Sequence, residues 1–191
     1  MKQRIYSVIG LWFLITICVI IARTTGIDPP VINMIGAYVS SILIAAVLYK
    51  APQHFFVLAL CFDLLAAAFG SVLDFYRSID GYDRFVHYLS GLLAAEGGRL
   101  IMQYILKRYH EKRLLLVQIL FALFFSCACA AIWEIYEFSA DQLIHTNMQG
   151  NNLNTMGDIV SGALGALTYT AGFFVWLIRD KKRKPDPGDS R

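Results

Sequence analysis

The chain has 191 residues, of which 57% are hydrophobic and 16% are charged, and its net charge is +3 at pH 7. Soluble domains carry about 25% charged residues, so this composition, with a mean hydropathy of +0.54, indicates an integral membrane protein. The basic residues form short clusters between apolar runs, which is typical of topology signals and argues against a nucleic-acid partner.

Six apolar runs follow one another along the chain, separated by polar or Pro- and Gly-containing connections. Each has about 18 to 25 residues, enough to cross a hydrocarbon core of about 30 Å as a helix. The runs cover residues 5–22, 31–49, 55–73, 84–106, 114–138 and 156–178. We therefore predict an all-α, polytopic transmembrane bundle of six helices, one domain over residues 1–178, with a basic, disordered cytoplasmic tail at residues 179–191.

The distribution of Lys and Arg predicts that both termini lie in the cytoplasm. Alternate connections on one side hold only Arg23, Arg77 and Arg84. The other side holds Lys2, Arg4, Lys50, Lys107, Arg108, Lys112, Arg113 and the basic cluster of the tail. Since basic connections stay in the cytoplasm, we expect a multi-pass membrane protein that contacts membrane lipids and has both termini in the cytoplasm. The first run is followed by Arg23 and not by a signal-peptide cleavage site. This pattern favours an uncleaved transmembrane helix over a signal peptide.

Three carboxylates near the end of the fifth run share one helical stripe. Glu134, Glu137 and Asp141 are spaced i, i+3, i+7, so their side chains lie on one face of a helix. A carboxylate within a membrane helix costs about 3 kcal/mol unless it has a partner. The stripe therefore predicts a cationic partner: a metal ion, a proton, a basic side chain or a charged ligand.

Two other helices are expected to bring polar groups to the same outer leaflet. His87 falls in the first turn of the fourth run, and Asp158 falls in the first turn of the sixth. Gly91 and Gly162 follow them at i+4, and such small residues let helices approach closely. The predicted site consists of His87, Glu134, Glu137 and Asp158, with Asp83, Arg84 and Asp141 in support.

The order of these motifs resembles a known family. The motifs are Asp83-Arg84-x-x-His87-x-x-x-Gly91, then Trp133-Glu134-x-x-Glu137, then Asp158-x-x-x-Gly162-Ala163-x-Gly165. Over residues 74–165 they resemble the YjdF-like family of uncharacterised bacterial inner-membrane proteins and, more distantly, VanZ-like membrane proteins. The resemblance implies a multi-pass membrane protein and carries no established reaction.

Three interpretations of the predicted site stay open. In the first, His87, Glu134, Glu137 and Asp158 bind a divalent metal ion. Its bound water would attack an envelope lipid or lipid-linked substrate, and the same four residues would be catalytic. In the second, Arg84 and His87 neutralise the carboxylates in a network that only holds the helices together or binds a partner. In the third, the groups relay a proton or an ion.

A second polar group lies nearer the predicted inner surface. Asp63 in the third run and Glu96 and Arg99 in the fourth fall at similar depth. Asp63 and Arg99 are interpreted as a charge-satisfying pair, or as part of a polar path in a proton- or ion-coupled transporter. Against a transporter, Pro and Gly do not interrupt two corresponding helices.

The longest predicted connection, residues 139–155, is rich in Asn and Gln. We interpret it either as a solvated connection or as a lid that binds a polar headgroup over the site. Asn154 or Thr155 is expected to cap the sixth helix.

Overall fold

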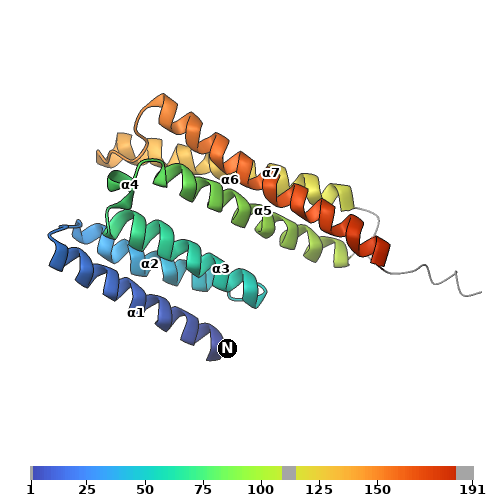
Figure 1. The fold of residues 1–191 in the computed structure, drawn as a ribbon, viewed down its shortest axis with the longest axis horizontal. Coiled ribbons are helices and arrows are strands. Elements are labelled where there is room, and N and C mark those ends of the chain that lie inside the picture. Colours follow the sequence, from blue (N-terminus) through green and yellow to red (C-terminus); the bar gives the residue numbers. More distant parts are fainter. Residues whose placement is uncertain (1, 109–114, 184–191) are drawn as a thin grey trace, which may run out of the picture. The chain divides into compact units, whose positions relative to one another are not determined.

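The computed structural model describes residues 2–108 and 115–183, and in this part of the chain all regular structure is helical. It contains seven α-helices and one π-helix (Figure 1). Four helices are long and apolar enough to cross a membrane: α1, the continuous α3 and η1, α6 and α7. The all-α prediction is confirmed. The count of six spans, the orientation and the single domain stay predictions.

The helices form two compact units, which are described separately: residues 1–89 and residues 90–191. Unit 1 contains α1 (Lys2–Thr25), α2 (Val31–Val47), α3 (Gln53–Asp63), η1 (Leu64–Val72) and α4 (Phe75–Ser78). Helix α5 (Tyr82–Arg108) begins in unit 1 and continues into unit 2. Unit 2 also contains α6 (Leu115–Ile144) and α7 (Asn152–Arg183).

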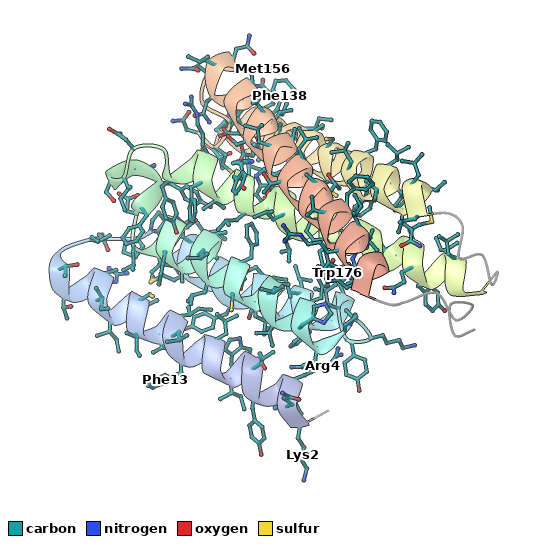
Figure 2. All side chains as sticks on the ribbon, turned by 45° about the vertical axis from the view of Figure 1, so that its right-hand side comes forward. Lys2, Arg4, Phe13, Phe138, Met156 and Trp176 are labelled. Carbon is teal, nitrogen blue, oxygen red and sulfur yellow. The ribbon has the colours of Figure 1, made fainter. Side chains whose placement is uncertain are left out.

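Unit 1 is built around an apolar core. On α1 the buried residues are Leu11, Ile15, Cys18 and Ala22, spaced so that they form one stripe of the helix. This stripe packs against Ala37, Phe56, Leu60, Ala68 and Val72 of α2, α3 and η1. On the opposite side of α1, Phe13 is 65% exposed and points away from the neighbouring helices (Figure 2). That exposed apolar face suits contact with lipid.

Polar contacts fix the ends and crossings of the unit 1 helices. Arg4 donates to the carbonyl of Leu48, the C-cap of α2, at 2.8 Å and also to those of Tyr49 and Ala51 in the turn that follows. Trp12 Nε1 donates to Ser41 Oγ at 2.8 Å between α1 and α2. The contacts of Arg4 place its guanidinium at a helix end, where burying a charge costs the least free energy.

The π-helix η1 continues α3 without a break and ends in a tight aromatic corner. Gly70 lies against the ring of Tyr76 so closely that a Cβ at this position would overlap it. The Tyr82 hydroxyl donates to the carbonyl of Leu65 at 2.9 Å. Asp74, with φ of 60°, turns the chain into α4. The corner thus anchors the last part of the third apolar run.

Unit 2 is held together by small residues. A Cβ on Gly91 of α5 would overlap the carbonyl oxygen of Gly162 on α7. Ser126 Oγ of α6 donates to the Gly91 carbonyl at 2.9 Å. Lower on α5, Gly98 packs against Ala122 of α6. Close approach of this kind replaces the large apolar side chains that would otherwise separate membrane helices.

The structure corrects the predicted bounds at the polar end of unit 2. Helix α6 runs on to Ile144 and α7 begins at Asn152, so residues 139–155 are mostly helical and the connection is confined to residues 145–151. The cap is Asn151, whose Oδ1 accepts from the Asn154 amide at 2.9 Å; the prediction of Asn154 or Thr155 was wrong. An extended lid over residues 139–155 is therefore excluded.

The predicted boundary of the tail also needs correction. Helix α7 continues to Arg183, so residues 179–183 are helical, whereas we predicted a disordered tail from residue 179. The remainder of the predicted tail, residues 184–191, lies outside the described residues, as do residues 109–114 of the basic connection before α6.

Candidate functional site

The carboxylates predicted on α6 lie on its buried stripe. Glu134 is 3% exposed and Glu137 is 8% exposed. The buried residues of this helix are Ala122, Ser126, Ala130, Glu134, Glu137 and Ala140. The spacing is helical throughout, so the two carboxylates continue the line of small residues with which α6 contacts α5 at Ala122 and Ser126. The predicted common face of Glu134 and Glu137 is confirmed.

Trp133 positions one of these carboxylates. Its Nε1 donates to Glu137 Oε1 at 2.9 Å along one turn of α6, and its ring packs against Tyr136 at a centroid distance of 5.2 Å. Trp133 itself is half exposed. The indole therefore covers Glu137 from the outer side of the helix and holds one of its oxygens.

Asp158 is the most deeply buried acid of unit 2, with no exposed surface. Asn154, one turn earlier on α7, donates to Asp158 Oδ2 at 2.6 Å. The same amide also lies 3.4 Å from the carbonyl of Gln149 in the connection. Asn154 therefore ties Asp158 to the chain that joins α6 and α7. Sequence reasoning assigned Asn154 a capping role and missed this contact, although its i−4 spacing from Asp158 pointed to it.

The two acidic helices meet at the polar end of unit 2. Phe138 of α6 and Met156 of α7 lie at the same end of the pair, and Trp176 lies toward the other end (Figure 2). Glu137 precedes the end of α6 at Ile144, and Asp158 follows the start of α7 at Asn152. At 1.5 Å per residue both lie roughly 10 Å below the connection. The structure thus buries three predicted acids at one end of unit 2.

His87 belongs to the first turns of α5, in unit 1. It is 6% exposed, and its Nε2 lies 3.5 Å from Asp83 Oδ1, one turn earlier. The pairing of these two predicted residues agrees with a supporting role for Asp83. Arg84, in contrast, is exposed. Convergence of His87 with the acids of unit 2 stays a prediction.

Asp141, which we predicted to support the site, contacts the connection that follows α6. It accepts from the Thr146 hydroxyl at 2.5 Å, the Met148 amide at 2.8 Å and the Gln149 amide at 3.0 Å. These three contacts fold the connection back onto the end of α6. Asp141 therefore shapes the chain next to the acids, and its support of the candidate site stays a prediction.

The inner group of unit 2 is a satisfied ion pair. Arg99 donates to Glu96 Oε1 at 2.6 Å and Oε2 at 2.7 Å. The Tyr169 hydroxyl of α7 bonds both partners, and Gln103 and the ring of Phe173 complete the surroundings of the guanidinium. Arg99 is thus paired with Glu96, three residues away, and a pair between Arg99 and Asp63 stays a prediction. The sequence showed the i, i+3 spacing, but it gave no signal for Tyr169.

Comparison with known families agrees with the membrane assignment. Residues 5–179 match the family described as "Predicted membrane protein (DUF2238)". The chain belongs to this family. This membership and the long apolar helices show that the chain is a membrane protein. The description of the family states no activity. Searches of curated proteins and of solved structures gave no match. The resemblance to YjdF-like and VanZ-like proteins stays a prediction.

Proposed function

We propose that this protein is a metal-dependent enzyme of the bacterial inner membrane that acts on an envelope lipid or lipid-linked substrate at the outer leaflet. The observation that carries the proposal is the burial of Glu134, Glu137 and Asp158 at one end of unit 2. Each ionised carboxylate in a membrane-spanning segment requires a compensating positive charge. Three such groups at one end favour a divalent cation, because one ion compensates two charges.

The ligand types fit such an ion. Carboxylate oxygens and one imidazole suit Mg²⁺, Mn²⁺ or Zn²⁺. As the nitrogen ligand we propose His87, which the sequence analysis predicted beside these acids. When bound, the ion would lower the pKa of a water molecule for attack on an ester or phosphoester. Asn154 and Trp133 would hold the acids in place.

The site's location favours a substrate at the membrane surface. Glu137 and Asp158 lie roughly 10 Å, and Glu134 roughly 15 Å, below the connection of residues 145–151, near the level where lipid headgroups meet the hydrocarbon. We propose the N-in/C-in topology, with this connection on the outer side, on the strength of the Lys and Arg distribution. We also propose that the chain is a YjdF-like protein, on the motifs quoted in the sequence analysis. Reporter fusions at residues 50 and 148 should report opposite sides of the membrane.

Metal content is the decisive measurement for this proposal. The unmodified protein, purified in mild detergent and freed of loose ions, should retain about one divalent ion per chain by elemental analysis. Glu134→Gln and Asp158→Asn should lose the ion, whereas Glu96→Gln, which changes a buried acid elsewhere in unit 2, should keep it. Size-exclusion profiles show whether each variant is folded. A metal content no higher than background in the unmodified protein would exclude the metal site. The acids would then belong to a network that holds the helices together or binds a partner.

Hydrolysis is tested separately. The metal-loaded protein should release a water-soluble product from radiolabelled bacterial envelope lipids, and Glu134→Gln should not. Metal binding without product would retain the ion site and remove the enzymatic part of the proposal.

A further inference from the structure

Asp63 is the one acidic residue of the three apolar runs of unit 1. Residues 5–22, 31–49 and 55–73 contain no other Asp, Glu, Lys or Arg. The side chain is 4% exposed, and it lies at the last residue of α3, where the α-helix changes to the π-helix η1. Single π-helical segments within α-helices are frequent at functional sites.

The contacts of Asp63 are few and neutral. Its side chain lies beside that of Ser40 on α2, whose hydroxyl donates to the Ala37 carbonyl at 3.2 Å. Within the described residues, Oδ2 has no hydrogen-bond partner. Glu96 of unit 2 is a direct contrast, since its two oxygens receive the guanidinium of Arg99 at 2.6 and 2.7 Å.

The neighbouring titratable groups cannot compensate a negative charge. Those on the three spans that pack together in unit 1 are Tyr6, Cys18, Tyr38, Tyr49 and Cys61. Phenol and thiol side chains do not supply a positive charge. The charged or imidazole groups of unit 1 fall outside the three runs: Lys2, Arg4, Arg23, Asp28, Lys50, His54, Asp74, Arg77, Asp80, Asp83, Arg84 and His87.

We propose that Asp63 is a proton-binding site within the membrane: it carries a proton at neutral pH, independently of the metal site proposed for unit 2. A buried carboxylate with no cation on the spans that pack around it is far more costly than the neutral acid. The neutral acid has an O–H donor, and the oxygen of the Ser40 hydroxyl can accept its proton in a hydrogen bond. Taking up and releasing this proton would couple unit 1 to the proton gradient.

A hydrophobic carbodiimide tests this proposal on the protein in its membrane. Dicyclohexylcarbodiimide reacts with a protonated acid: the acid proton moves to a nitrogen of the reagent and the carboxyl oxygen bonds to its central carbon. The whole reagent is retained, so peptide mass spectrometry locates the adduct. We expect the adduct on Asp63 and none on Glu96, whose charge is held by Arg99. The yield should fall as the pH is raised. Asp63→Asn should abolish this adduct.

The same experiment can overturn the proposal without a variant. Absence of the Asp63 adduct in the membrane, together with its formation after denaturation at low pH, would show that the acid is ionised or out of reach. Equal labelling of Glu96 would show that the reagent does not distinguish the two sites. Protection of Asp63 by Na⁺ at constant pH would assign the site to a metal cation instead of a proton. Ser40→Ala should retain the adduct, because the hydroxyl does not supply the proton.

Discussion

The two units bury polar groups among apolar helices in different ways. Unit 1 packs large side chains such as Ile15 and Phe56 around its core, and its spans contain the single acid Asp63. Unit 2 packs Gly91 against Gly162 and buries several acids, one of them paired with Arg99. Small residues bring backbones and short side chains close enough for polar contacts between helices. Polar chemistry is therefore concentrated where side chains are small.

Removing one partner of the ion pair of unit 2 is expected to have the largest effect on stability. Arg99→Met removes the guanidinium and leaves Glu96 buried beside Tyr169, so we expect a loss of about 3–5 kcal/mol in the free energy of unfolding. The double variant Glu96→Gln/Arg99→Met removes both charges and should be more stable than Arg99→Met alone. Denaturation in mixed detergent micelles measures both. An Arg99→Met protein as stable as the unmodified one would show that the pair does not hold α5 to α7.

A substitution that separates α5 from α7 is expected to have the next largest effect on stability. Gly91→Ala places a methyl group where the Gly162 carbonyl oxygen lies, and the required shift should cost about 1–3 kcal/mol. Gly172→Ala is the matched control, because a Cβ there meets no atom within 4 Å. It should leave stability unchanged or raise it by up to about 1 kcal/mol, since Ala favours helix. Similar thermal unfolding of the two variants would contradict the tight crossing.

The sequence predicted the helices well because the apolar runs are long enough to cross a membrane. The end of α6 was misplaced because Asp141 and Gln142 were taken as connection, although polar residues continue a helix readily once it leaves the apolar layer. The shared face of Glu134 and Glu137 follows from helical spacing alone and was predictable. The bonds of Tyr169 to Glu96 and Arg99 were not, since they depend on the register between α5 and α7.

The two units also differ in the side chains that satisfy backbone groups at their helix ends. Unit 1 closes α2 with the long cationic side chain of Arg4, which reaches three carbonyls. Unit 2 begins α7 with a short neutral side chain, Asn151, which accepts one amide hydrogen from Asn154. In both units a side chain supplies hydrogen-bond partners to backbone groups at or next to a helix end.

Asn151→Ala should therefore cost about 1 kcal/mol, less than either change inside unit 2. The control is Asn152→Ala at the next, exposed position, which should alter stability by no more than about 0.5 kcal/mol. Because Asn154 also holds Asp158, loss of the cap should loosen that acid as well. Hydrogen exchange at the Asn154 and Thr155 amides should rise in Asn151→Ala and stay unchanged in Asn152→Ala. Equal exchange in the two variants would mean that solvent, rather than Asn151, satisfies the start of α7.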